Sequence, residues 1–229
     1  RKIVISTGAV TTIAGTVHSS ENSAYGLVNG EGNSAKFYYP SGITIDGNNL
    51  YVADSNNHMI RKIVISTKVV STFAGSGTSG FTNGTGTAAK FSAPAGIISD
   101  GTNLYVADTN NNKIRKIVIS TGLVTTLAGS GTTGSADGIG ISASFAKPRG
   151  MTIVAGNLYV VDTNNHNIRK IVISTGVVTT LAGSGVAGST NATGTNASFH
   201  KPGGITSDGT NLYVVDGDNH KIRKVVIAT

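Results

Sequence analysis

The chain has 229 residues, of which 38% are hydrophobic and 13% are charged, and its formal net charge is +7. The charged fraction is about half that of an average globular protein, which excludes a disordered polyelectrolyte and a charged coiled coil. Because cysteine is absent, the chain has no disulfide, no thiolate nucleophile and no cysteine-based zinc site. No run of 18 apolar residues is present, so the sequence predicts no membrane span.

Short β-prone segments follow one another from the first residue. The sequence RKIVIST opens the chain at Arg1, and a second apolar segment covers residues 9–15. The next set is complete and has four segments, named A, B, C and D, at residues 41–46, 49–54, 58–66 and 69–75. Turn-forming residues separate them, as in Asp46-Gly47-Asn48 between A and B. No window keeps a helical period of 3.6 residues, so an all-β fold is predicted.

This set of segments repeats along the whole chain. The sequence RKIVIST returns at Arg61, Arg115 and Arg169, and RKVVIAT stands at Arg223, with spacings of 60, 54, 54 and 54 residues. Four other residue types keep the 54-residue step: Phe37, Phe91, Phe145, Phe199; Pro40, Pro94, Pro148, Pro202; Tyr51, Tyr105, Tyr159, Tyr213; Asp54, Asp108, Asp162, Asp216. Antiparallel four-stranded units repeated at this length are typical of β-propeller blades.

We therefore interpret residues 1–229 as a single β-propeller domain, or an arc of one, built from four-stranded antiparallel blades. The four repeats cover residues 1–60, 61–114, 115–168 and 169–222, and residues 223–229 start a further repeat unit.

Residues 42–63, with the sequence GITIDGNNLYVADSNNHMIRKI, resemble the NHL repeat, which is named for an Asn-His-Leu signature after a Val-x-Asp strand end. Three later copies carry the same pattern, so the resemblance covers essentially the whole chain. The departures are Met59, Asn167 or Lys221 in place of leucine, and Asn112 in place of histidine. The resemblance implies a propeller, usually of six blades. It implies little about chemistry, because related propellers include sensor domains, RNA-binding modules, scaffolds and a few enzymes.

Both ends of the chain predict incomplete blades. Residues 203–228 supply segments A, B and C without D, whereas residues 9–15 supply a D segment without A and B. Joining them would complete a fourth blade and remove two exposed sheet edges. Residues 1–7 and 223–229 are both C segments, however, so one is redundant in a closed four-bladed ring. We expect an arc whose ends pair with further blades or copies, and a start at Arg1 without a methionine indicates a mature protein or a piece of a longer array.

The informative loops are predicted to share one face of the propeller. Strand order brings the D-to-A and B-to-C connections to this face, together with the long Gly/Ser/Thr loops and the Asn-Asn-His turns. Lys147, Arg149 and Lys201 stand at the entrances of A segments, and they form a candidate binding face. A structural alternative needs no ligand, because Phe91 and its equivalents can tuck back and tether each loop to its blade.

Each repeat places an aspartate seven residues before an arginine, in the pairs Asp54 and Arg61, Asp108 and Arg115, Asp162 and Arg169, and Asp216 and Arg223. We expect each aspartate to bind the arginine across the B–C hairpin, or the N–H groups of the Asn-Asn turn. The arginines are then structural, and Asp108→Ala costs about 1–3 kcal/mol. A nucleic-acid partner is not expected, because no aromatic residues alternate with the basic ones to stack bases.

Three histidines, His58, His166 and His220, occupy one equivalent position in separate blades. A shared metal ion would require ligand distances of about 2.1 Å, so we expect these residues to cap turns instead. His18 and His200 stand outside the repeat.

Other motifs give no cofactor and no catalytic group. Asp137-Gly138-Ile139-Gly140 is similar to part of a calcium loop, but one carboxylate is too few, and an Asx turn explains it. No serine lies in a G-x-S-x-G context with a triad order. Closely similar blades also argue against catalysis, because an acid and a base must differ in environment.

Two hypotheses about function remain. The favoured one is a non-catalytic binding or scaffold propeller that mediates protein or ligand interactions. Low charge density and loops rich in Gly, Thr, Ser and Asn suggest an extracellular, periplasmic or cell-surface protein of bacterial type. The alternative is a propeller enzyme of the lyase or hydrolase type with a site at the axial opening. A metal or a cluster of non-repeated polar residues at the axis would distinguish the two.

Overall fold

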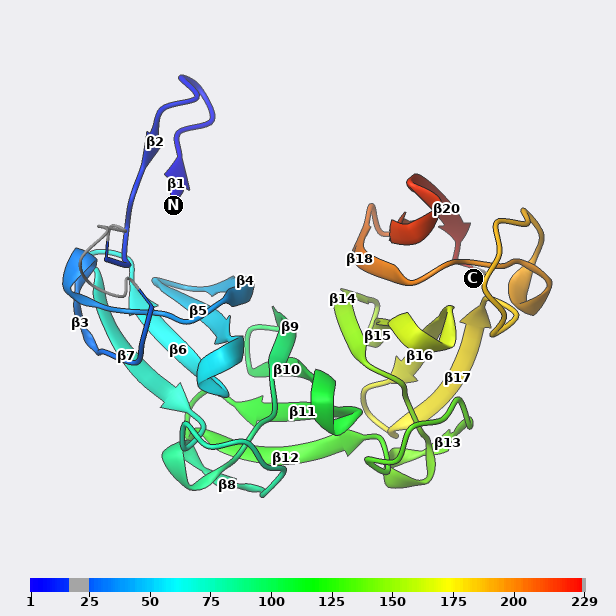
Figure 1. Ribbon diagram of the computed structural model, residues 1–229, viewed down its shortest axis with the longest axis horizontal. Coiled ribbons are helices and arrows are strands. Elements are labelled where there is room, and N and C mark those ends of the chain that lie inside the picture. Colours follow the sequence, from blue (N-terminus) through cyan, green and yellow to red (C-terminus); the bar gives the residue numbers. More distant parts are fainter. Residues whose placement is uncertain (17–24, 228–229) are drawn as a thin grey trace.

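Four antiparallel sheets form the blades of a β-propeller around a common axis (Figure 1). The computed structural model describes residues 1–16 and 25–227. The first three blades contain the strands β4 (Pro40–Asp46), β5 (Asn49–Asp54), β6 (Met59–Val64) and β7 (Val69–Ala74); β9 (Pro94–Ser99), β10 (Asn103–Asp108), β11 (Lys113–Val118) and β12 (Leu123–Ala128); β14 (Pro148–Val154), β15 (Asn157–Asp162), β16 (Asn167–Val172) and β17 (Val177–Ala182). The fourth contains β18 (Pro202–Ser207), β19 (Asn211–Asp216) and β20 (Lys221–Val226). The predicted all-β propeller is therefore confirmed.

Each of the first three sheets has a fifth, two-residue strand that the sequence analysis missed. These strands are β3 (Gly30–Glu31), β8 (Gly84–Thr85) and β13 (Gly138–Ile139), and they pair with the outer D strands β7, β12 and β17. Single 3-10 turns follow them at Gly32–Ser34, Gly86–Ala88 and Gly140–Ser142, and another stands at Gly194–Asn196. The long D-to-A loops are thus hydrogen-bonded to the edges of their own blades.

The B and C strands of every blade are joined by a 3-10 turn, at Ser55–Asn57, Thr109–Asn111, Thr163–Asn165 and Gly217–Asn219. The next residue, His58 in the first blade, has a left-handed backbone with φ 55°. In the D-to-A loop, Tyr38 C=O accepts a hydrogen bond of 3.0 Å from the N–H of Asn56. The B–C turns and D-to-A loops therefore lie on the same face of the propeller.

The inner A strands of neighbouring blades approach so closely that glycine is required between them. A Cβ atom on Gly150 would lie 2.6 Å from the carbonyl oxygen of Gly203, and one on Gly96 would overlap the carbonyl oxygen of Arg149. Gly42 makes the same approach to the second blade. This spacing brings β4, β9, β14 and β18 together around the axis (Figure 1).

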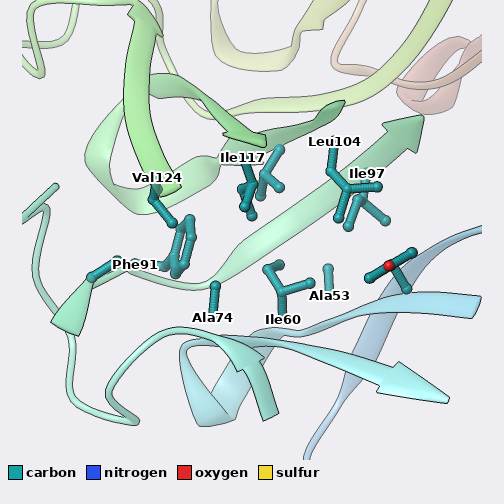
Figure 2. Close-up of a cluster of buried hydrophobic side chains, with 11 residues drawn as sticks. Ala53, Ile60, Ala74, Phe91, Ile97, Leu104, Ile117 and Val124 are labelled. Carbon is teal, nitrogen blue, oxygen red and sulfur yellow. The ribbon is translucent and has the colours of Figure 1, made fainter. Parts of the chain in front are cut away.

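The hydrophobic core lies between blades rather than within one. Tyr51, Ala53 and Ile60 of the first blade are at most 1% exposed, because the second blade covers them with Ile97 and Leu104 (Figure 2). The same arrangement recurs between the second and third blades and between the third and fourth. The sheets of the second and third blades therefore bury two apolar faces each, as the runs of apolar residues on both faces of the strands require.

The ends of the chain form a separate hairpin and a three-stranded blade. Strands β1 (Lys2–Ile3) and β2 (Val10–Thr11) pair with each other, and β18, β19 and β20 form the fourth sheet. Among the described residues no strand pairing joins these two groups, which lie on opposite sides of an opening in Figure 1. No helix in the described ranges is long and apolar enough to span a membrane.

The C-to-D turn of the first blade carries a strained residue. Lys68 has φ 61°, whereas the equivalent Gly122 and Gly176 have φ 71° and 72°. A left-handed backbone costs a residue with a Cβ about 1–2 kcal/mol relative to glycine. We expect Lys68→Gly to raise the free energy of unfolding in urea by about 1 kcal/mol and Gly122→Lys to lower it similarly. A destabilised Lys68→Gly variant would contradict this assignment of strain.

Candidate functional site

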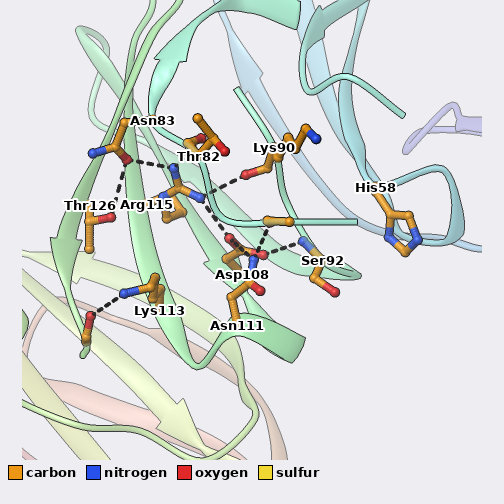
Figure 3. A network of polar contacts seen from close by, with 12 residues as sticks. His58, Thr82, Asn83, Lys90, Ser92, Asp108, Asn111, Lys113, Arg115 and Thr126 are labelled. Atoms are coloured by element: carbon orange, nitrogen blue, oxygen red, sulfur yellow. Dashed lines mark hydrogen bonds and ion pairs between the residues drawn. The ribbon is translucent and has the colours of Figure 1, made fainter. Parts of the chain in front are cut away.

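A buried ion pair stands at the junction of each blade with its long loop (Figure 3). In the second blade Arg115 Nη1 donates to Asp108 Oδ2 at 2.9 Å, and both side chains are 0% exposed. Asp108 Oδ1 accepts the N–H of Ser92 at 2.7 Å, and Asp108 Oδ2 accepts a second bond from Asn111 at 2.8 Å. The aspartate thus binds the arginine and the loop as well as the Asn-Asn turn.

The arginine extends this network into the loop. Arg115 Nη1 donates to the carbonyl oxygen of Lys90, and Nη2 donates to the carbonyl oxygen of Thr82 and to Asn83 Oδ1 at 2.8 Å. Its guanidinium carbon lies 5.2 Å from the centre of the Phe91 ring. Phe91 is fully buried, so the loop is tethered as the structural alternative expects.

The structure brings together all four predicted aspartate–arginine pairs, but not directly across the hairpin. Val106 is the partner of Arg115 in the β10–β11 register, and Lys113 is the partner of Asp108. The arginine therefore reaches back diagonally to the aspartate. The remaining pairs have distances of 2.9, 3.0 and 2.9 Å, and they are Asp54 with Arg61, Asp162 with Arg169, and Asp216 with Arg223.

Burial governs the electrostatics of these pairs. Burial raises the pKa of Asp162 to about 6, against the opposing effects of the Ala146 N–H, the Asn165 side chain and the charge of Arg169. The arginine charges at positions 61, 115 and 169 are fully buried as well, so they are not presented to a phosphate. Each buried charge is stabilised by its ionic partner inside the blade and would be strongly destabilising without it.

Because both partners are buried, Asp108→Ala costs more than the sequence predicts. It leaves Arg115 as an uncompensated buried charge, and we expect a loss of about 3–5 kcal/mol in the free energy of unfolding. Asp216→Ala is the matched control, since its partner Arg223 is 10% exposed and keeps contact with water. Urea denaturation should give the smaller loss of about 1–3 kcal/mol for the control. Equal losses would contradict the dependence on burial.

In the first three blades, the residue after the B–C turn accepts a hydrogen bond from the following blade. His58 Nδ1 accepts the N–H of Ala93 at 3.1 Å, and His166 Nδ1 accepts the N–H of Lys201 at 3.0 Å. In the second blade Asn112 Oδ1 accepts the N–H of Lys147 at 2.9 Å. The donor of each bond is a residue with positive φ that precedes a proline. Both a histidine nitrogen and an asparagine oxygen can accept this bond, which explains why asparagine replaces histidine in the second blade.

A polar surface cluster lies between the third and fourth blades. The rings of His166 and His200 are 5.5 Å apart, and Asp218 lies 3.5 Å from His200 Nε2 and 3.3 Å from Lys201 Nζ. Within residues 1–16 and 25–227, no group of three or more His, Asp or Glu side chains has metal-binding geometry. His18 lies outside the described residues.

Protonation of His166 should weaken its inter-blade bond. Burial lowers the pKa of His166 from 6.5, and His200 and Lys201 lower it further, whereas Asp218 and Asp216 oppose them. Because the unfolded chain then binds more protons than the folded one, stability falls as pH decreases through 6.5. We expect unfolding midpoints measured between about pH 8 and 5 to decrease on the acidic side through this residue.

His166→Asn is the matched control, since Asn112 already accepts the same bond in the second blade without titrating. The variant should lose this part of the pH dependence while keeping its stability at neutral pH. An unchanged difference between acidic and neutral pH would show that His166 does not cause it.

One residue of the candidate binding face, Arg149, lies at the axis and carries a charge that the equivalent residues of the other repeats lack. A cavity of about 380 Å³ is lined by the A strands of all four blades, and Arg149 is the charged residue in its wall. Ser41, Ala95 and Gly203 occupy the equivalent positions. The Arg149 side chain is exposed and makes no hydrogen bond or ion pair with any described residue.

Lys147 and Lys201 are less available than Arg149. Lys147 Nζ donates to Asn110 Oδ1 at 2.9 Å, and Lys201 Nζ is paired with Asp218. The structure therefore places the three predicted residues on one face, but only Arg149 lines the axial cavity.

Asp137 is a structural residue of the third loop. Its Oδ1 atom accepts a 2.8 Å bond from Arg169 Nη2 and a 3.1 Å bond from Thr180, and Asn83 does the same for Arg115. This contact, rather than the Asx turn expected from the sequence, accounts for the Asp or Asn at this position. Sequence reasoning missed it because the partners are 32 residues apart.

Curated proteins with similar sequences contain NHL repeats. The human NHL repeat-containing protein 2 is 27% identical over 286 residues, which cover 84% of this chain and 39% of that protein. The chain thus spans about two fifths of the length of the curated relatives that it matches first. Curated relatives come from animals and a plant, so the expected bacterial type is not shown.

Solved structures share the fold at lower identity. An auxiliary nutrient binding protein from Bacteroides ovatus matches with a TM-score of 0.66 and 21% identity, over 83% of this chain and 48% of that one. Virginiamycin B lyase from Staphylococcus aureus matches with a TM-score of 0.57 and 19% identity, over 86% and 55%. The NHL repeat profile matches residues 37–63 and 145–171. The chain therefore carries NHL repeats at these two sites, on four sheets that form a β-propeller.

Proposed function

We propose that this protein is a non-catalytic binding propeller that receives an acidic group of a protein partner at its axial opening. The observation that carries the proposal is the position of Arg149, which has no ionic partner among the described residues and lines the 380 Å³ axial cavity. A guanidinium binds carboxylates through paired hydrogen bonds, so an acidic side chain or a chain terminus is the complementary group. The extracytoplasmic location is part of the proposal and rests on composition alone.

The other walls of the cavity favour recognition over chemistry. They consist of glycine backbone and of apolar residues such as Ile97 and Met151, with Ser41 as a further polar side chain. No described residue lining this cavity is a His, Asp, Glu or Lys that could serve as a general acid or base. The wall of the cavity therefore supports binding of a charged group, which its apolar surroundings would strengthen.

Peptide selection tests this proposal directly. Phage-displayed peptides are selected on the immobilised protein, and the enriched peptides are titrated against wild type and Arg149→Gln by fluorescence anisotropy. We expect the enriched peptides to carry Asp, Glu or a free terminal carboxylate and to bind Arg149→Gln about 10- to 100-fold more weakly.

Lys224→Gln is the matched control, because it removes one exposed charge from β20 outside the cavity. This variant should bind the peptides like wild type. If both variants lost affinity equally, the effect would come from the change in net charge and not from the position of Arg149. Turnover is tested with quinupristin, the ligand of the inactive S. aureus lyase structure, by mass spectrometry. A product that separates from quinupristin by chromatography and forms only in the presence of the protein would contradict the non-catalytic proposal and favour the enzyme alternative.

A further inference from the structure

Three of the four repeats carry an aspartate at the turn between their A and B strands, and these are Asp46, Asp100 and Asp208. In two of these repeats the tyrosine of the B strand binds the carboxylate. Tyr105 Oη donates to Asp100 Oδ2 at 2.7 Å, and Tyr213 Oη donates to Asp208 Oδ2 at 2.9 Å. A carboxylate next to the tyrosine hydroxyl is therefore a regular feature of the A–B turn.

The third repeat lacks this carboxylate. Val154 stands in place of the aspartate at the end of β14, and Tyr159 Oη makes no hydrogen bond with any described residue. Tyr159 is the partner of Lys170 in the β15–β16 register, so the two side chains lie on the same face of the sheet. Lys170 Nζ also has no hydrogen bond or ion pair among the described residues. A hydroxyl donor and an ammonium group thus lie next to each other without an acceptor.

A pocket of about 310 Å³ lies at this position, between the third and fourth blades. Tyr159 and Lys170 line it together with the apolar side chains of Val154, Ala155 and Ile227. No Asp or Glu among the described residues is part of its wall. The volume is at the lower end of the range of about 300–1,000 Å³ for small-molecule pockets, so the pocket fits a short organic molecule rather than a large cofactor.

The contact between neighbouring blades also changes where the carboxylate is missing. Ser99 Oγ of the second blade donates to Asp46 Oδ1 of the first blade at 3.3 Å. Val154 cannot accept the corresponding bond from Ser207, the equivalent serine of the fourth blade. Ser207 Oγ instead donates to the carbonyl oxygen of Asn211 in its own blade at 2.8 Å. The junction of the third and fourth blades therefore lacks an acceptor that the first junction has.

We propose that this pocket binds a small organic carboxylate, which accepts hydrogen bonds from Tyr159 Oη and Lys170 Nζ in place of the missing aspartate. Hydrogen bonds between charged partners are about twice as strong as neutral ones, and the apolar wall covers the hydrocarbon part of the acid. The other polar side chains of the wall are engaged, since Asn157 donates to the carbonyl oxygen of Ala155 and Thr210 donates to Asp208. Two donors match a single carboxylate better than a phosphate.

Titration with sodium butyrate, followed by NMR of the backbone amides at constant pH and ionic strength, tests the site. We expect saturable shifts of the N–H signals of Ala155, Gly156 and Thr210, with a dissociation constant of about 1–10 mM. Butyramide has the same shape without the charge and should bind at least about tenfold more weakly. Absence of saturable shifts, equal binding of butyramide, or tighter binding of inorganic phosphate would overturn the proposal.

Two variants each remove one donor from the pocket. We expect Lys170→Gln to weaken butyrate binding at least about tenfold and Tyr159→Phe to weaken it about fivefold. Lys116→Gln is the matched control, because Lys116 has the same position in the second blade, where Asp100 already accepts the tyrosine hydroxyl. This variant should bind butyrate like wild type, and an equal loss in Lys170→Gln and Lys116→Gln would contradict the assignment of the site.

Val154→Asp restores the carboxylate from within the chain. The new side chain should bind Tyr159 and Lys170 as the aspartates of the other repeats do, so the butyrate shifts should disappear. Val154→Thr has a similar volume without a charge and should bind butyrate like wild type. Persistent butyrate binding by Val154→Asp would show that the ligand does not take the position of the aspartate, and the proposal would be wrong.

Arg149→Gln separates this site from the axial cavity. Arg149 lies at the start of β14 and Val154 at its end, so the two sites are on opposite faces of the propeller. Butyrate binding in the pocket should therefore be unchanged in Arg149→Gln, whether or not the axial cavity binds acidic peptides. Loss of the butyrate shifts in Arg149→Gln, but not in Lys170→Gln, would place the ligand at the axis and overturn the proposal.

Discussion

The buried aspartate–arginine pair is the interaction on which the rest of each blade depends. Two opposite charges at 0% exposure are stable only if nearly all their hydrogen-bonding groups are occupied, and the long loop supplies most of those groups. The loop has few apolar residues of its own and no regular structure beyond two residues of β8 and a 3-10 turn. Its order therefore comes from the same contacts that compensate the charges, and neither loop nor pair is stable without the other.

Because the repeated residues stabilise the blades and their loops, few residues remain available to bind a ligand. Arginine, aspartate, phenylalanine and the turn asparagine recur in each repeat and are engaged in the same network. Function must then depend on residues that break the repeat, and Arg149 does so at the one place where all four blades meet. His200 and Asp218 also break it, but they bind each other and Lys201 at the surface. Repetition thus separates the structural residues from the candidate ligand-binding ones.

The sequence predicted the strands well because each carries a local signal. Segments A and B were placed within one residue of β4 and β5, since Asp46-Gly47-Asn48 determines the turn between them. The two-residue strand β8 was missed, because a Gly-Thr pair has no periodicity. The histidine bonds were missed for another reason: His58 and Ala93 are 35 residues apart in different blades, so only the relative position of two blades reveals the contact. The axial role of Arg149 likewise required knowledge of which strand lies innermost.

In a repeat protein of this kind, the stability of each blade depends on its contacts with the blades next to it. Apolar burial lies between blades, so the second and third blades are stabilised from two sides, whereas the fourth has a neighbouring blade on one side only. The fourth blade shows the consequence, because its sheet has three strands within the described residues and its Arg223 is the one arginine of the four pairs that solvent reaches. An exposed edge such as β20 is also a template for pairing with another strand.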